Sequence, residues 1–305
     1  MNKQASNPLQ TELLGVTLKN PVIAASGTFG FGHEYAELMD VSLLGGISGK
    51  GLTLNGSAGN AGARILETPA GMLNSIGLEN PGVRQFVEKE APYMRTLGCA
   101  VIANLGGHSE EDYVRGAELL NAADIDILEL NISCPNVKAG GMAFGLQPET
   151  AARVVSLVKE RSRHPLLVKL SPNAPSVKEI ACACEAAGAD GLSLVNTYLG
   201  MAIDIHRRRA VFENVYAGLS GPCIRPIALR MVHEVCKAVA VPVVGMGGIA
   251  TWEDALMFIL VGATAVQVGA ATFAHPTAML DIIDGLKDYC EQNGIDQIAA
   301  LRGCI

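Results

Sequence analysis

Short apolar runs alternate with amphipathic segments of about a dozen residues along most of this chain. The apolar runs are rich in Val, Ile, Leu and Ala and end at small or polar residues, which is typical of strands buried on both faces. They predict strands over 22–25, 44–48, 100–104, 127–131, 166–170, 191–195, 243–245 and 265–268. Between them the pattern predicts helices over 109–122, 148–161, 176–187, 224–239 and 251–261, several of which open with Ser, Thr or Pro.

Eight strand and helix units in 305 residues favour an α/β fold of the (β/α)8 TIM barrel type. An open doubly wound sheet is the alternative, but the glycines of 27–32 lack the G-x-G-x-x-G spacing of dinucleotide-binding folds. Because no repeat, low-complexity block or linker divides the chain, we expect residues 1–305 to form a single domain. The intervals 50–81 and 196–221 are long and follow strand ends, where barrel enzymes insert active-site loops.

Composition supports this class and narrows the setting. Hydrophobic residues make up 49% of the chain and aromatic residues only 5%, as expected for aliphatic strands buried on both faces. A net charge of −7 disfavours nucleic-acid binding, and we interpret the run Arg207-Arg208-Arg209 as a solvated loop. The sequence shows no signal peptide and no apolar run of the ~18 residues that a membrane helix needs, so we expect a cytoplasmic protein.

The eight cysteines are scattered and show no spacing suited to a metal site, so we expect reduced thiols and no bound metal. Cys99, Cys182, Cys184 and Cys236 are interpreted as small buried hydrophobic residues.

Polar side chains gather where the predicted strands end, which in a barrel is one common mouth. Strands one to six end in, or are followed by, Ser26, Lys50, Asn104, Asn131, Lys169, Asn196 and Thr197. Strands seven and eight are followed by Gly247-Gly248 and Gly269-Ala270, whose backbone N–H groups are open to a phosphate. Since unpaired polar groups are costly in apolar surroundings, this set indicates a bound anionic ligand that forms hydrogen bonds.

Two residues carry the strongest chemical signal. Lys169 lies within an apolar strand, and an ammonium group is rarely buried without a partner or a function. Cys134 lies in a Gly-rich segment between Ser133 and Pro135, just after a strand end. A thiolate there can serve as a nucleophile or as a general base, and the spacing alone leaves both roles open.

The motifs at these positions resemble those of the class 1 dihydroorotate dehydrogenases, flavin enzymes of pyrimidine biosynthesis. The resemblance runs almost from end to end, through SGTFGFG (26–32), GKG (49–51), ETPAGMLNSIGLENPG (67–82), NISCPNVKAGG (131–141), VKLSPN (168–173), LVNT (194–197), GLSGP (218–222) and GMGGI (245–249). Cysteine at position 134 is similar to class 1, and the segments 74–82 and 138–145 are similar to subclass 1B. That subclass resembles a catalytic subunit whose electrons reach NAD+ through a separate subunit.

The resemblance implies that one FMN lies in the barrel mouth and that dihydroorotate is oxidised to orotate. It implies cofactor contacts from Ser26, Lys50, Gly51, Asn104, Asn131, Lys169, Val195, Gly221, Gly247, Gly248, Gly269 and Ala270. It implies substrate contacts from Lys50, Asn74, Ser75, Ile76, Gly77, Leu78, Asn131, Asn196 and Thr197. The catalytic residues it implies are Cys134, as the base that removes the proton at C5, and Lys50, while a hydride moves from C6 to N5 of FMN.

The resemblance also implies a homodimer that joins an electron-transfer subunit in a heterotetramer, with FAD and a 2Fe-2S cluster in the partner subunit alone. Two positions depart from the family pattern: Ala270 lacks a hydroxyl for the phosphate, and 215–217 lacks a glycine pair. The alternatives are a 1A-like homodimer that reduces fumarate, a flavin barrel acting on uracil or thymine, and a barrel aldolase with a Schiff base on Lys169. A barrel without catalytic activity would leave the strand-end residues unexplained.

Overall fold

The computed structural model describes residues 7–133 and 144–305, and within them eight parallel strands close into a barrel. In order around the barrel these strands are β3 (Val22–Ala24), β4 (Gly46–Ser48), β7 (Ala100–Leu105), β8 (Ile127–Asn131), β9 (Leu166–Lys169), β10 (Gly191–Leu194), β15 (Val243–Met246) and β16 (Ala265–Val268). β16 pairs with β3 and closes the ring. The predicted TIM barrel is confirmed, and each strand lies close to its predicted range.

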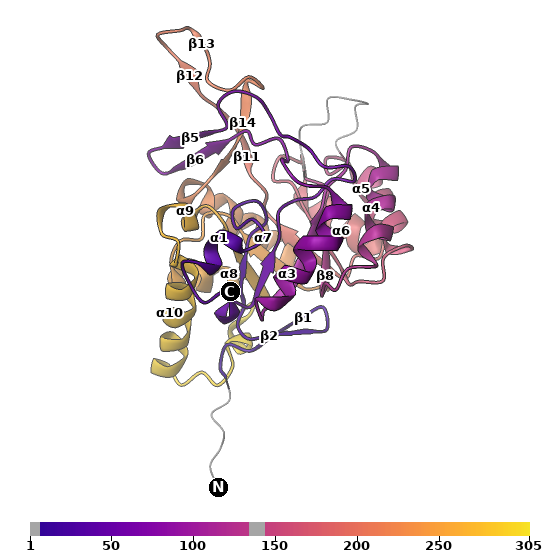
Figure 1. The fold of residues 1–305 in the computed structure, drawn as a ribbon. Coiled ribbons are helices and arrows are strands. Elements are labelled where there is room, and N and C mark those ends of the chain that lie inside the picture. Colours follow the sequence, from indigo (N-terminus) through magenta and orange to yellow (C-terminus); the bar gives the residue numbers. More distant parts are fainter. Residues whose placement is uncertain (1–6, 134–143) are drawn as a thin grey trace.

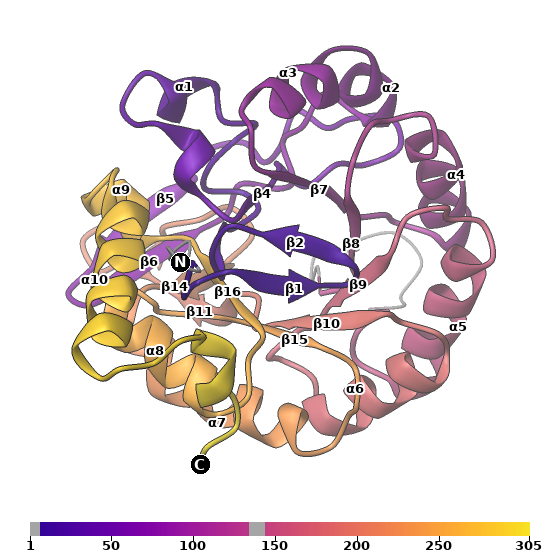
Figure 2. The same ribbon diagram turned by 90° about the horizontal axis from the view of Figure 1, so that it is seen from below.

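Helices surround the barrel, as the view from below shows (Figure 2). The predicted helices are confirmed as α4 (Glu110–Leu120), α5 (Pro148–Lys159), α6 (Val177–Ala186), α7 (Arg225–Cys236) and α8 (Trp252–Leu260). Their starts follow from capping, since Ser109 Oγ accepts a hydrogen bond from Asp112 N at 3.1 Å and Thr251 forms a capping box with Asp254. None of the helices in the described part of the chain has both the length and the apolar character to span a membrane.

Other helical segments lie outside the ranges given for the predicted helices. They are α1 (His33–Ala36), η1 (Val41–Leu43), α2 (Val83–Gln85), η2 (Phe86–Glu90), α3 (Ala91–Thr96), η3 (Pro222–Ile224), α9 (Ala271–Ala274), α10 (Ala278–Gln292) and η4 (Ile298–Leu301). Of these, only α10 is long, and it packs beside α8 in the helical ring.

A hairpin closes the bottom of the barrel, where the strands begin (Figure 2). It consists of β1 (Thr11–Leu13) and β2 (Val16–Leu18), paired antiparallel. Leu13 and Leu18 are buried in one cluster with interior strand residues such as Ile102 and Leu167. Because this apolar plug fills the lower end of the barrel, only the opposite end, at the C-terminal ends of the strands, is open to a polar ligand.

The two long intervals between strands fold together into one antiparallel sheet above that mouth (Figure 1). Its order is β11 (Tyr198–Met201), β14 (Tyr216–Ser220), β6 (Gly71–Asn74) and β5 (Ile65–Thr68). β14 pairs with β6 so that Gly218 lies opposite Asn74, which joins the intervals directly. The sheet has its own small core of Leu73, Phe212 and Ala217. Much of what the sequence suggested as loops is therefore strand.

A second hairpin, β12 (Ile203–Asp204) with β13 (Arg209–Ala210), projects beyond this sheet (Figure 1). It carries Arg207, Arg208 and Arg209, which are all exposed, as predicted. Arg209 belongs to β13 rather than to a loop, and Arg207 lies 3.6 Å from Asp204. The arginines thus project into solvent at the tip of the molecule.

Candidate active site

The register of the barrel places the predicted site residues of neighbouring strands side by side. Asn131 of β8 is the partner of Lys169 on β9, and Lys169 is the partner of Ser193 on β10. The side chains of Asn104, Asn131 and Lys169 belong to residues that are at most 5% exposed. The structure therefore brings these three predicted residues together in the buried floor of the mouth.

Glu129, which the sequence reasoning missed, forms the centre of this floor. The residue is fully buried, and both carboxylate oxygens accept two hydrogen bonds. Oε2 accepts from Ser48 Oγ at 2.6 Å and from Asn104 Nδ2 at 2.7 Å. Oε1 accepts from Ser193 Oγ at 2.7 Å and from Gln267 Nε2 at 2.8 Å. The available signal was a single acidic residue inside an apolar strand run, ILELN.

The charge of Glu129 is held by its surroundings. Burial alone raises the pKa of its carboxyl group, but the nearby charge of Lys169 and the hydrogen bonds outweigh that effect. The pKa of Glu129 is accordingly lowered below its ordinary value, so the floor contains a carboxylate and a lysine of opposite charge.

A chain of hydrogen bonds links the predicted asparagines. Asn131 Nδ2 donates to Asn104 Oδ1 at 3.4 Å, and Asn131 Oδ1 accepts from the Ser133 hydroxyl at 2.5 Å. Asn196 in turn donates to Ser133 Oγ. Ser133, a second residue that the sequence reasoning did not assign, therefore connects two predicted substrate-binding residues, Asn131 and Asn196. Cys134, which follows it, lies outside the described residues.

The antiparallel sheet carries predicted substrate residues to the same mouth. Asn74 Nδ2 donates to the carbonyl oxygen of Gly218 at 3.2 Å, and a Cβ at Gly218 would collide with Thr197. Asn74 and Thr197 are thus neighbours although they come from different intervals. Asn60, which was not predicted, donates to both Ser75 O and Ser75 Oγ at 3.1 Å and holds the segment that leads to Ile76, Gly77 and Leu78.

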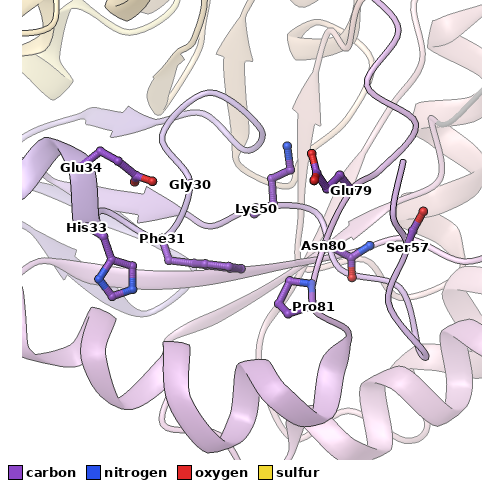
Figure 3. A pocket seen from close by; sticks show the side chains of 9 residues that line it. All are labelled: Gly30, Phe31, His33, Glu34, Lys50, Ser57, Glu79, Asn80 and Pro81. Carbon is purple, nitrogen blue, oxygen red and sulfur yellow. The ribbon is translucent and has the colours of Figure 1, made fainter. Parts of the chain in front are cut away.

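Lys50 lines a cavity of about 450 Å³ on one side of the mouth (Figure 3). Its other lining residues are Gly30, Phe31, His33, Glu34, Ser57, Glu79, Asn80 and Pro81. Burial lowers the pKa of Lys50, which the charge of Glu79 partly opposes, and Glu79 itself lies 2.7 Å from Arg64. Lys50 is therefore a partly desolvated cation close to the predicted substrate segment, rather than a lysine on a surface loop.

Glycines gather at the ends of β14 and β15. Gly221, Gly247 and Gly248 have φ of 104°, 121° and 77°, in the left-handed region that favours glycine. A Cβ at Gly248 would lie 2.8 Å from both Gly221 O and Arg225 N, and one at Gly247 would lie 3.1 Å from Val195 Cγ2. The structure thus brings together four predicted cofactor residues at a turn made of backbone.

The remaining predicted residues lie around this turn and the floor. Gly269 and Ala270 follow β16, the neighbour of β15, and Ala270 offers only its backbone at the start of α9. A Cβ at Gly51 would lie 3.0 Å from Asn104 Oδ1 and 3.8 Å from Ser26 Oγ, so these three residues are neighbours. Near β14, Val215 adopts a φ of 65°, in the left-handed region that favours glycine.

Among the described residues, no group of three His, Cys, Asp or Glu side chains is arranged to hold a metal ion, and the described cysteines are free thiols. Of the four cysteines interpreted as buried, Cys99 and Cys184 are buried, whereas Cys182 and Cys236 are half-buried. Burial raises the pKa of Cys99, Cys184 and Cys236 to about 12.

Comparison with known proteins gives a consistent result. The sequence matches the dihydroorotate dehydrogenase family over residues 8–290. It is 52% identical over 296 residues to the "Dihydroorotate dehydrogenase B (NAD(+)), catalytic subunit" of Petrotoga mobilis, covering 97% of this chain and 99% of that protein. It is 50% identical over 297 residues to the protein of the same name from Alkaliphilus metalliredigens, covering 97% and 98%. The protein of that name from Geotalea uraniireducens is 52% identical over 298 residues, again covering 97% and 98%.

Proposed function

Because the chain belongs to the dihydroorotate dehydrogenase family, we propose that it oxidises dihydroorotate to orotate in pyrimidine biosynthesis, as the catalytic subunit of an NAD+-linked enzyme. The observation that carries this proposal is the identity of about half of all positions, over nearly the whole chain, to catalytic subunits with that name. A barrel aldolase with a Schiff base on Lys169 belongs to another family and is not supported.

The cofactor of this reaction is FMN, one per chain. Backbone N–H groups at Gly221, Gly247-Gly248 and Gly269-Ala270 would hold its phosphate, and Lys169 with the strand-end amides would bind its ring. The observation that supports this fit is the close approach of other atoms at two glycines of the mouth, where a Cβ would lie 2.8 Å from Gly221 O at Gly248 and 3.0 Å from Asn104 Oδ1 at Gly51. When bound, FMN supplies the N5 atom that accepts a hydride from C6 of the substrate.

The substrate carries a carboxylate and a ring of amide donors and acceptors. The Lys50 ammonium and the backbone of 75–78 meet the carboxylate. Asn74 and Asn196 each offer a donor and an acceptor to the ring amides, and Asn131 offers its second amide hydrogen, because its oxygen already accepts two bonds from Ser133. The close approach of Asn74 to Thr197 supports a common site for these residues. The absence of a carboxylate in uracil and thymine argues against those substrates.

The base that removes the C5 proton is Cys134. An ordinary thiol has a pKa of about 8.5, so it is partly ionised near neutral pH and can accept a proton. The residue directly before Cys134 is Ser133, which is buried and forms hydrogen bonds with Asn131 and Asn196. Cys134 therefore follows a segment that is anchored to the proposed substrate ligands.

The physiological assembly is a cytoplasmic homodimer joined to an electron-transfer subunit, which carries FAD and a 2Fe-2S cluster. The names of the relatives support a partner, since each is a catalytic subunit of an NAD(+) enzyme. A class 1A-like homodimer, which would pass electrons to fumarate directly, is the competing assignment.

The test is to purify the chain alone and record its flavin spectrum with and without dihydroorotate. A yellow preparation whose FMN band bleaches on addition of dihydroorotate supports the proposal, and failure to bind FMN refutes it. Assays of the isolated chain with fumarate and with NAD+ then separate the two assemblies. Fast turnover with fumarate would contradict the NAD+-linked assignment.

A further inference from the structure

We propose that Glu129 is the buried counter-ion of Lys169 and a positioning residue of the flavin site, where it sets how much positive charge the cofactor experiences. This inference deepens the proposed function and rests on it. Glu129 does not line the cavity beside Lys50, and no role was expected for it from the sequence.

The hydrogen bonds around Glu129 are built for a carboxylate. All four partners can donate, and two of them, Asn104 Nδ2 and Gln267 Nε2, are amide nitrogens that can only donate. The other two are the hydroxyls of Ser48 and Ser193, at 2.6 and 2.7 Å. With two donors on each oxygen, the ionised form uses its acceptor capacity, whereas a protonated carboxyl would require one serine hydroxyl to turn and accept instead of donate.

These bonds also place Glu129 beneath the residues that face the ligand. They tie β8 to β4, β7, β10 and β16, so the carboxylate is held from both sides of the barrel. Asn104, which it orients, continues the chain of bonds to Asn131. Ser193, which it also orients, is the register partner of Lys169. Glu129 therefore contacts one proposed cofactor-binding residue, Asn104, directly, and it is linked to Asn131 and Lys169 through Asn104 and Ser193.

The negative charge of Glu129 offsets the positive charge of Lys169, which affects any ligand bound above the pair. Lys169 is only 4% exposed, and a buried cation is costly unless an anion offsets it. With Glu129 present, the pair has no net charge, so only part of the lysine's positive potential reaches a ligand above it. Without the carboxylate, the floor gains one positive charge and stabilises the negative charge of a reduced flavin more strongly.

Gln267 makes Glu129→Gln a clean test of this charge. Gln267 Oε1 is buried and has no hydrogen-bond partner. The side-chain amide of Gln267 can therefore rotate by half a turn without breaking any hydrogen bond of Oε1. The turned amide would present Oε1 to the new NH2 group at position 129. The remaining oxygen at 129 keeps its bonds from Ser48 and Asn104. The substitution thus removes the charge while an equivalent set of hydrogen bonds remains possible.

The first experiment measures the reduction potential of bound FMN by equilibration with a reference dye. Glu129→Gln should favour the reduced flavin by about tenfold in the equilibrium constant, which is ~30 mV for a two-electron couple. The matched control is Ser193→Ala, which removes one hydrogen bond from Glu129 but keeps its charge, and it should leave the potential near that of the wild type. An unchanged or more negative potential in Glu129→Gln would overturn the proposal.

The second experiment needs no flavin. Lys169→Met leaves the carboxylate unpaired, so the folding equilibrium constant of the FMN-free protein should fall by at least tenfold, measured by chemical denaturation. Adding Glu129→Gln to Lys169→Met should recover stability, because the unpaired charge is gone. A double variant less stable than Lys169→Met contradicts the pairing. Failure of the wild type to bind FMN would instead count against the proposed function.

Discussion

The glycine turn after β15 offers the sharpest test of the phosphate site, through Gly248→Ala. The substitution adds one methyl group at a φ of 77° and 2.8 Å from two backbone atoms, Gly221 O and Arg225 N. Backbone atoms cannot rotate away as a flexible side chain can. The added methyl group must therefore displace the turn that we assign to the phosphate.

The magnitude follows from two costs. A left-handed conformation costs roughly 1–2 kcal/mol for a residue with a Cβ. Overpacking of a close contact costs roughly a further 1–3 kcal/mol. If about 1.4 kcal/mol of this total falls on the bound state, FMN affinity decreases about tenfold. We expect a decrease of at least that size.

The assay is titration of the FMN-free protein with FMN, followed by the quenching of flavin fluorescence. Gly15→Ala is a matched control, because Gly15 has a similar φ of 82° but no heavy atom within 4 Å of the added Cβ. It lies in the turn between β1 and β2, at the closed end of the barrel (Figure 2). The control should lose about 1–2 kcal/mol of unfolding free energy and keep its FMN affinity.

Equal FMN affinities in the two variants would refute this reasoning. The close contact at Gly248 would then have no connection with the phosphate, and the cofactor assignment of Gly221 and Gly247 would fail with it. A loss of stability in Gly248→Ala without a loss of FMN affinity would refute it equally.

Substitutions at three further residues test other parts of the site. Cys134→Ala should retain FMN and bind orotate but lose most turnover, and near-normal turnover in this variant would exclude Cys134 as the base. Cys134→Ser should retain slow turnover with a pH optimum above that of the wild type, because a hydroxyl is a weaker acid than a thiol. Lys50→Met should weaken orotate binding about 10- to 100-fold. Because burial lowers the pKa of Lys50 and only the ammonium binds a carboxylate, wild-type affinity should fall as pH rises through that pKa, and a pH-independent affinity would contradict the assignment. Asp254→Asn, which removes the ion pair with Arg225 beside Gly248, should cost about 1–3 kcal/mol in denaturation experiments, and an unchanged midpoint would show that the pair is not stabilising.

The sequence predicts the barrel well because its signals are local. A strand buried on both faces needs aliphatic residues regardless of which strand lies beside it, so runs such as 127–131 and 166–170 can be predicted as strands from their own residues. The starts of α4 and α8 follow from Ser109 and Thr251, whose side chains accept hydrogen bonds within the first turn. Once the strands are located, the residues at their C-terminal ends are known as well, and these make up most of the candidate site.

The missed features depend on partners that are distant in the sequence. β6 and β14 are short, mix polar with apolar residues and become strands by pairing Asn74 with Gly218, which are 144 positions apart. The hairpin of β1 and β2 is likewise defined by the barrel end that it covers. Short segments like these show little periodicity of their own, because their burial comes from neighbours that only the folded chain supplies.

Glu129 shows the same division within the site. From the sequence alone, this residue interrupts an apolar run, and nothing nearby indicates a partner. Its five neighbours, Ser48, Asn104, Lys169, Ser193 and Gln267, come from five other strands. The order of residues along the chain defines which of them end the strands, because burial and capping act over a few positions. Which charges and hydrogen bonds meet at the centre depends on the closed barrel, because closure brings residues from the whole chain into contact.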